Sequence, residues 1–393
     1  MRSMVSHGVD VVSQADRQGD DYRPGGFHVG RIFGFPLRLT VSWVFLAIFF
    51  VLFWSPGLGE AMHLSGLAQY LVGVGFVAGL LLSVLLHELG HAFTARFYGV
   101  GVRGITLDLL GGYTEFNQDS PSPRVELATA VAGPAVSAIL GIGCAAAAFP
   151  LPSGSIPERL AIQLAIANII VAIYNALPGW PLDGGRVVRA AVWALRGDRD
   201  RGLLIAGWSG RVVAVLTGLV SAWLVLIGFF GYLSLVIGAF IAFSIWRGAT
   251  MAVLTARVRA RYPMIDPVAL ARPIFTVPAG TSLAEATRRA HEAGATGAAL
   301  GVTDPEGRLS ALVVPAAAQA VPDQRRPWVA VETLARGIDA VATIPATARG
   351  ADVIKLLQGD ADRPYLVTSG DHVVGVLTIM DVIRVLDPEG NRR

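Results

Sequence analysis

Two histidines four residues apart, with a glutamate beside the first, are the residues of this sequence best suited to metal chemistry. They stand in His87-Glu88-Leu89-Gly90-His91. Residues four apart on a helix share a face and lie about 6 Å apart, so both imidazoles can reach one ion. Zinc accepts histidine nitrogens, and an intervening glutamate can hold a water at an open coordination position. The motif indicates a hydrolytic zinc site in which Glu88 takes a proton from water.

The surroundings of this motif favour metal binding over a solvated charge cluster. No Asp, Glu, Lys or Arg separates Glu60 from Glu88, which places the motif in a segment apolar enough to enter a bilayer. An ionisable side chain at that depth costs about 2.5 to 3.5 kcal/mol even on insertion scales. Three such side chains need compensation, and coordination of a metal supplies it.

A catalytic zinc site with one open position requires a third protein ligand. Asp183 is the best candidate, because it also follows a long uncharged stretch, in Asn175-Ala-Leu-Pro-Gly-Trp-Pro-Leu-Asp183-Gly-Gly. The Pro and Gly residues make a continuous helix improbable there, and broken backbone at membrane depth requires protein or a water-lined cavity around it. We expect one Zn²⁺ per chain, held by His87, His91 and Asp183. Asn175 is expected to donate either to a substrate carbonyl or oxyanion or to a neighbouring helix.

Composition and hydropathy predict how these residues are positioned. Of the 393 residues, 53% are hydrophobic and 16% are charged, against roughly 25% charged in an ordinary soluble domain. The fold class is therefore a polytopic α-helical membrane protein with about six transmembrane helices, followed by a soluble α/β region. The expected spans are residues 37–55, 66–98, 125–149, 160–195, 211–230 and 232–251.

The arginines predict the orientation of the chain. Arg17, Arg23, Arg31 and Arg38 precede the first span, whereas residues 56–65 contain no Lys or Arg. Because positive loops stay inside, the N-terminus and everything after about residue 255 should be cytoplasmic, in a multi-pass protein of the plasma membrane. The net charge of only +3 is spread beside apolar runs, which does not favour a nucleic-acid partner.

The C-terminal third contains an internal repeat. Phe275-Thr-Val-Pro-Ala279 matches Ala342-Thr-Ile-Pro-Ala346, and each is followed by a helix-like stretch, two strand-like runs and another helix. This order resembles a pair of cystathionine-β-synthase (CBS) domains. The predicted division is a cytoplasmic tail (1–36), a transmembrane domain (37–254) whose core of about 66–196 contains both metal motifs, a linker (255–265) and two CBS-like repeats (266–322 and 323–393).

The two metal motifs together resemble the signatures of the site-2 protease family of intramembrane metalloproteases, His-Glu-x-x-His and Asn-x-x-Pro-x-x-x-x-Asp-Gly. The resemblance implies that His87, His91 and Asp183 are zinc ligands and that Glu88 is the catalytic glutamate. It also implies regulated intramembrane proteolysis, with cleavage within or near a transmembrane segment of a membrane-protein substrate. The family includes a subgroup with CBS domains, which this architecture resembles.

Two further features resemble family patterns less closely. Gly111-Gly112 looks like the Gly-containing loop near the family's active site, or is a plain turn. Gly133-Pro134 begins a pattern that has Ser137 where the family usually has Asn, so the role of that position is open. The glycine and proline could simply permit close helix packing.

For the C-terminal repeats, Thr378-Ile-Met-Asp381 resembles the Thr/Ser-x-x-Asp of nucleotide-binding CBS domains. Thr378 and Asp381 would then contact an adenine nucleotide, and a structural pair, or a homodimer formed through CBS domains, is the other interpretation. The alternative function for the whole chain is a CBS-regulated transporter or channel that uses the intramembrane His and Asp residues for ions. Clustering of those residues at one depth favours a single reaction centre.

Overall fold

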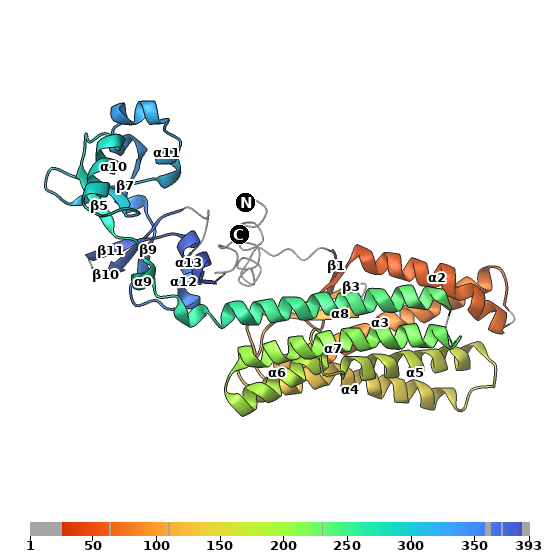
Figure 1. Cartoon of the computed structure of the whole chain (residues 1–393). Coiled ribbons are helices and arrows are strands. Elements are labelled where there is room, and N and C mark those ends of the chain that lie inside the picture. Colours follow the sequence, from red (N-terminus) through yellow and green to blue (C-terminus); the bar gives the residue numbers. More distant parts are fainter. Residues whose placement is uncertain are drawn as a thin grey trace. The chain divides into compact units, whose positions relative to one another are not determined.

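The computed structural model describes residues 26–62, 64–108, 111–229, 231–357, 363–370 and 372–386. The chain divides into a helical unit, Asp20–Arg257, and a C-terminal unit that begins at Val258. The helical unit contains both metal motifs, and its helices run side by side (Figure 1). They are α2 (Val41–Met62), α3 (Leu67–Phe97), α4 (Pro123–Ala148), α5 (Ile156–Asn175), α6 (Asp183–Arg196), α7 (Arg199–Leu226) and α8 (Tyr232–Arg259).

Five helices in the described part of the chain are long and apolar enough to cross a membrane, namely α3, α4, α5, α7 and α8. The first of the six expected spans corresponds to α2. The apolar part of α2, Val41–Gly57, is shorter than the other five. The expected span 160–195 is two helices, α5 and α6, because the segment between them contains Pro178 and Pro181, which interrupt helical hydrogen bonding.

A small sheet lies against the motif-bearing helix α3. Its strands are β1 (Phe27–Ile32), β2 (Phe35–Leu39), β3 (Val102–Asp108) and β4 (Gly111–Phe116), in the spatial order β1-β2-β3-β4. β2 and β3 are parallel, and the other pairs are antiparallel. Leu37, Ile105 and Leu107 are buried with Leu89 and Ala92 of α3. The sheet therefore packs on α3 at the level of the histidine motif.

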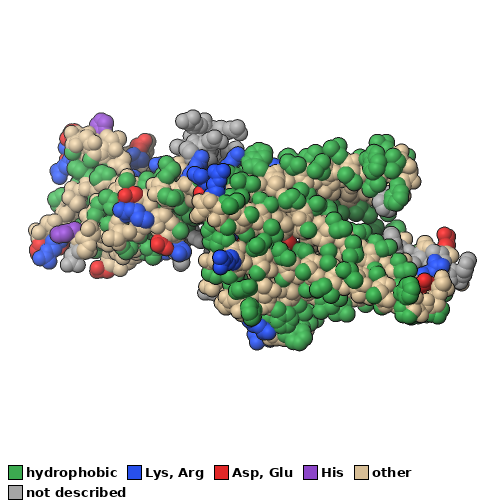
Figure 2. Space-filling model, turned by 90° about the horizontal axis from the view of Figure 1, so that it is seen from below, with side chains coloured by type: hydrophobic (Ala, Val, Ile, Leu, Met, Phe, Trp, Pro, Cys, Tyr) green, Lys and Arg blue, Asp and Glu red, His purple; other side chains and the backbone are tan. Residues whose placement is uncertain are grey.

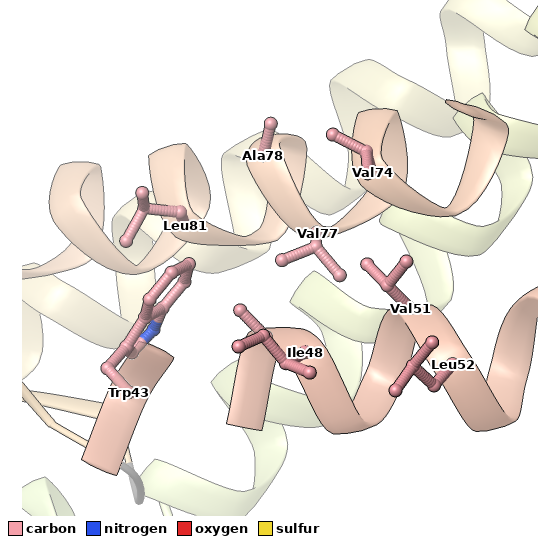
Figure 3. A pocket seen from close by; sticks show the side chains of 9 residues that line it. Trp43, Ile48, Val51, Leu52, Val74, Val77, Ala78 and Leu81 are labelled. Atoms are coloured by element: carbon pink, nitrogen blue, oxygen red, sulfur yellow. The ribbon is translucent and has the colours of Figure 1, made fainter. Parts of the chain in front are cut away.

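The outer surface of the helical unit is suited to lipid. Hydrophobic side chains cover the face shown in Figure 2, and charged side chains gather toward the ends of this unit. A groove between α2 and α3 is also apolar (Figure 3). It is lined by Trp43, Ala47, Ile48, Val51, Leu52, Val74, Val77, Ala78 and Leu81. The groove offers no acid, base or metal ligand, so the chemistry must lie elsewhere in the unit.

The C-terminal unit repeats one order of elements. The first copy comprises β5 (Ile274–Pro278), α10 (Leu283–Glu292), β6 (Ala299–Thr303), β7 (Leu309–Val313) and α11 (Pro315–Gln319). The second comprises β9 (Thr343–Pro345), α12 (Ala351–Leu356), β10 (Tyr365–Ser369), β11 (His372–Leu377) and α13 (Ile379–Leu386). Shorter elements are η1 (Tyr262–Met264), α9 (Pro267–Leu270), η2 (Asp323–Trp328), η3 (Val331–Leu334), β8 (Ala335–Gly337) and η4 (Ile338–Ala340).

The two copies form separate sheets that share buried residues. The sheet orders are β5-β6-β7-β8 and β11-β10-β9. Each copy has its own core, around Val277 and Val302 in the first and around Ile344 and Val367 in the second. A further cluster joins Leu312 of β7 to residues of β10 and β11. The repeat expected from the sequence is therefore present as two packed α/β halves.

Two element boundaries differ from the expected division of the chain. β1 and the start of β2 lie within the expected tail (1–36), while residues 1–25 lie outside the described residues. α8 continues to Arg259, inside the expected linker (255–265). Buried Ala252, Val253 and Ala256 extend its packed face toward that end. Hydropathy marks the lipid-facing length of a helix and not its full length.

A buried ion-pair cluster fastens α6 to α4. Glu126 of α4 has no exposed surface. Its carboxylate pairs closely with Arg189 and lies 3.4 Å from Nε of Arg186, both on α6, and Arg199 of α7 lies 3.7 Å away. Removing one partner of a buried pair leaves charge uncompensated, which is strongly destabilising. This cluster should therefore hold the start of α6 in place.

We predict that Glu126→Gln lowers the stability of the protein by about 3 to 5 kcal/mol, because three arginines lose their shared buried carboxylate. Thermal unfolding of the purified protein in detergent measures the loss. Glu285→Gln is the matched control, since Glu285 pairs with Arg288 and Arg289 on the exposed face of α10, and it should change little. Equal stability of the two variants would contradict the role of the cluster.

Candidate metal centre

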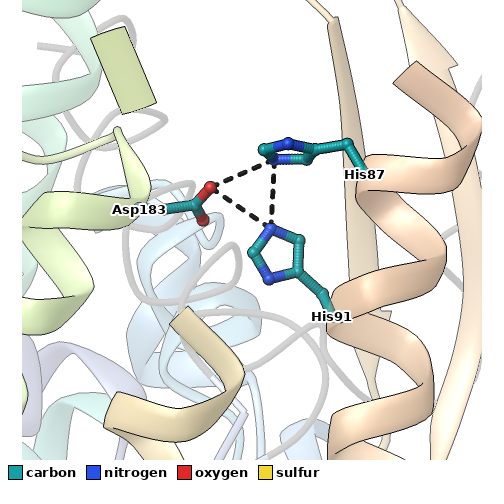
Figure 4. Close-up of side chains that lie close together, drawn as sticks. All are labelled: His87, His91 and Asp183. Atoms are coloured by element: carbon teal, nitrogen blue, oxygen red, sulfur yellow. Dashed lines mark hydrogen bonds and ion pairs between the residues drawn. The ribbon is translucent and has the colours of Figure 1, made fainter. Parts of the chain in front are cut away.

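The structure brings His87, His91 and Asp183 together from two helices. Both histidines are buried on α3, and Asp183 is the first residue of α6. Nε2 of His87 and Nε2 of His91 each lie 3.2 Å from Oδ2 of Asp183, and the two nitrogens are 3.3 Å apart. Figure 4 shows the two imidazoles and the carboxylate pointing toward one another. The expected agreement in depth between the two motifs is therefore present.

These three separations fit a tetrahedral zinc ion. Zinc binds histidine nitrogen at about 2.0 to 2.1 Å, and ligands at that radius around a tetrahedral centre are about 3.3 Å from one another. The observed spacings of 3.2, 3.2 and 3.3 Å have this size. Three protein ligands leave the fourth position open, which is typical of catalytic and not structural zinc sites. The cluster could therefore bind a metal ion.

The outer nitrogens of both histidines are held by α4. Nδ1 of His91 donates to the backbone carbonyl of Thr129 at 2.7 Å, and Nδ1 of His87 lies 2.9 Å from Oγ of Ser137. A carbonyl can only accept, so the proton of neutral His91 sits on Nδ1 and its Nε2 lone pair faces the cluster. A hydrogen bond at the ring nitrogen that does not face the metal orients a metal-binding histidine. The structure thus places Ser137, whose role the sequence left open, beside His87.

Gly133 leaves room for the ion. A β-carbon at this position of α4 would lie 2.3 Å from Nε2 of His91 and 2.6 Å from Nε2 of His87. A side chain there would occupy the space between the converging ligand atoms. The glycine is therefore needed by the site itself, beyond the helix packing expected from the sequence.

The segment before Asp183 is packed too tightly for side chains at the next two positions. A β-carbon at Gly184 would lie 2.2 Å from the carbonyl oxygen of Leu177, and one at Gly185 would lie 2.3 Å from the nitrogen of Trp180. The backbone nitrogen of Trp180 donates to the carbonyl of Ala206 on α7. The two glycines thus let α6 begin directly against this anchored loop, which delivers Asp183 to the histidines.

Glu88 is held from the sheet. Its Oε2 accepts a 2.8 Å hydrogen bond from Oγ1 of Thr114 on β4. A β-carbon at Gly112 of the same strand would lie 2.7 Å from Cγ of Glu88. The glycine pair suspected from the sequence therefore includes a residue in contact with this glutamate. Thr114 was missed, because nothing in a strand pattern marks which threonine meets a distant helix.

The remaining expected site residues belong to other elements. Asn175 is the last residue of α5 and is half-buried. In the C-terminal unit, Oδ2 of Asp381 accepts from the backbone nitrogen and Oγ1 of Thr378, at 2.9 and 2.7 Å. Arg272 lies 3.1 Å from the same oxygen. Thr378 and Asp381 are thus together, in a buried and internally bonded arrangement.

Known proteins resemble this chain over most of its length. Peptidase family M50 matches residues 75–163 and 153–216, which include all three clustered ligands. The zinc metalloprotease Rip3 of Mycobacterium tuberculosis is 34% identical over 91% of this chain and 92% of its own length. The Synechocystis protein sll0528, also named a zinc metalloprotease, is 29% identical over 94% of this chain and 97% of its own.

A solved structure also resembles part of this chain. A site-2 protease from Methanocaldococcus jannaschii is 24% identical, covers 58% of this chain and 95% of its own, and superposes with a TM-score of 0.43. The sequence relationships to zinc metalloproteases establish the family, and they favour a protease over a transporter or channel. The chain belongs to peptidase family M50 and is a zinc-dependent protease of the site-2 type.

Proposed function

We propose that His87, His91 and Asp183 hold the catalytic zinc of an intramembrane protease and that Glu88 is its general acid and base. The observation that carries this proposal is the set of three ligand separations of 3.2 to 3.3 Å, the edge length of a tetrahedral zinc site. The substrates of an intramembrane protease are membrane proteins, and we expect cleavage within or near a transmembrane segment.

The residues of the chain divide the reaction between them. When bound, zinc supplies Lewis acidity toward water and the substrate carbonyl. Glu88, oriented by Thr114, takes a proton from the attacking water and returns it to the leaving amine. Thr129 and Ser137 keep the histidine rings aimed at the centre. Asn175 donates to the substrate carbonyl or to the oxyanion that develops from it.

We predict that Glu88→Gln lowers cleavage of a transmembrane reporter by at least about 100-fold, because the proton acceptor is lost. Bound zinc should stay at one per chain, since Glu88 is not a ligand. Asp183→Ala should lose both zinc and cleavage, and Asn175→Ala should lower cleavage while keeping zinc. Metal analysis and cleavage by the purified proteins measure these effects. Full cleavage by Glu88→Gln would refute the mechanism, and full zinc occupancy in Asp183→Ala would refute the third ligand.

The space at Gly133 yields a second prediction. Gly133→Ala should abolish zinc retention against a chelator, because its methyl group would stand 2.3 Å from Nε2 of His91. Gly143→Ala on the same helix is the matched control, as a β-carbon there has nothing within 4 Å, and it should keep wild-type zinc. A Gly133→Ala protein that retains zinc as well as Gly143→Ala would exclude an ion between the histidines.

We further propose that the C-terminal unit is a cytoplasmic CBS pair that regulates the protease by binding an adenine nucleotide. The repeated strand-helix-strand-strand-helix order supports a CBS pair. The lack of Lys and Arg in residues 56–65 supports the cytoplasmic orientation, because it favours the outer side of the membrane for that loop. On nucleotide binding, Thr378 and Asp381 would give up the contacts that they make with each other and with Arg272, and would contact the nucleotide instead. Homodimer formation through this unit is the competing role.

One experiment tests the orientation and the ligand together. In inside-out membrane vesicles, trypsin should cut the C-terminal unit, and AMP or ATP should slow this cut at least several-fold in wild type but not in Asp381→Asn. In right-side-out vesicles the unit should be protected. Cutting in right-side-out vesicles contradicts the cytoplasmic orientation, whereas equal cutting with and without nucleotide leaves the pair as a structural or dimerising element.

A further inference from the structure

Parts of the helices α7 and α8 form a long uncharged hairpin, and an arginine flanks this segment on each side of it in the sequence. From Val212 to Trp246 the sequence has no Asp, Glu, Lys, Arg or His, and Arg211 and Arg247 stand at its two ends. The part of α7 from Val212 to Leu226 rises about 22 Å. With the turn that joins it to α8, this length approaches the bilayer core of about 30 Å. Arg211 and Arg247 therefore lie where the hairpin leaves the hydrocarbon.

Arg211 is held between two tryptophans. Its guanidinium lies 4.5 Å from the ring centre of Trp208 on α7 and 5.4 Å from that of Trp246 on α8. One of its nitrogens donates to Oγ1 of Thr250 at 3.3 Å. Aromatic faces attract a cation and keep it in one orientation. Arg211 is thus a fixed positive charge between two helices that also carry its supports.

The charge of Arg211 has no carboxylate within ion-pair distance among the residues that the structure describes, and its buried Nε has no hydrogen-bond acceptor there. Arg247, one residue after Trp246, lies 6.0 Å from the ring centre of Phe243 on its own helix. A nearby anion would stabilise a half-buried cation at the membrane boundary. Elsewhere in this unit the protein supplies one, as Glu126 does for Arg186 and Arg189.

We propose that Arg211, Trp208 and Trp246 form a binding site for the headgroup of an anionic phospholipid. The phosphate of such a lipid lies at the depth where the uncharged hairpin ends, and tryptophans prefer the same layer. Guanidinium groups bind phosphate through two parallel hydrogen bonds. The two indoles are 48% and 43% exposed, so a lipid can reach the charge that they frame. Basic pockets between membrane helices commonly recognise anionic headgroups.

The same two helix turns seat the loop that leads to Asp183. A β-carbon at Gly210, beside Arg211, would lie 2.0 Å from the carbonyl oxygen of Trp180, and one at Gly248, beside Arg247, would lie 2.8 Å from Cγ of Pro181. A bound headgroup would draw α7 and α8 together at this level. Lipid binding should therefore stabilise the hairpin against which the loop is packed, independently of whether the chain cleaves peptides.

The test uses the full-length protein in nanodiscs of phosphatidylcholine with and without phosphatidylglycerol. Phosphatidylglycerol should raise the unfolding temperature of the wild type and remain bound in native mass spectrometry. Arg211→Gln should bind it roughly tenfold more weakly, the effect of losing one charge-assisted contact. Arg196→Gln is the matched control, because it removes the same charge from an exposed arginine at the end of α6, and it should behave as wild type.

Several results would overturn the proposal. These are an Arg211→Gln protein that keeps the full response to phosphatidylglycerol, an equal loss in Arg196→Gln, or an equal response of the wild type to phosphatidylcholine alone. Displacement of the lipid by millimolar inorganic phosphate would identify a free-anion site instead. Should Arg211→Gln fail to fold, Trp208→Leu replaces it. That variant keeps the charge but loses its support, so wild-type lipid binding by it would also refute the site.

Discussion

The helical unit must hold two imidazoles and a carboxylate in contact inside an apolar helix bundle, and the rest of its structure depends on this requirement. Their ligand atoms are 3.2 to 3.3 Å apart, a separation that three lone-pair donors tolerate well around a shared cation. To keep that separation, α3 and α6 must be fixed to a fraction of an ångström. α4 packs against both helices, so it can hold the two in place together.

Four residues of α4 perform this role. Glu126, Thr129, Gly133 and Ser137 are buried and recur at spacings of three and four residues, which places them along one face of the helix. Thr129 and Ser137 hold the two histidines, Gly133 leaves the space between them, and Glu126 binds the arginines of α6. One helix face thus orients all three proposed ligands, and the serine at the position where the family usually has asparagine supplies the contact to His87.

The sequence alone could indicate the three proposed ligands, because their constraints are local. Helical spacing pairs His87 with His91, and the prolines and glycines on either side of Asp183 indicate a break in the helix within an apolar stretch. The contacts around them depend on which residue of one helix faces which residue of another, and a single sequence carries no such register. Thr114, Thr129 and the role of Ser137 were unreadable for that reason. The strands β1 to β4 were missed because they lie mostly in the expected tail (1–36) and in the connection between the expected spans 66–98 and 125–149, where the sequence indicated only a loop at Gly111-Gly112.

The metal ligands and the proposed general base are positioned by different parts of the unit. The histidines are oriented from α4, whereas Glu88 is oriented from β4 through Thr114 and the close approach of Gly112. The sheet reaches Glu88 only because Leu37, Ile105 and Leu107 pack against Leu89 and Ala92 on α3. Hydrophobic packing of the sheet therefore sets the direction of the base without touching the metal ligands. Displacement of the sheet would move Glu88 and leave the metal ligands in place. The activity of a zinc-loaded protein could therefore be changed through the sheet without a change in the ligand cluster.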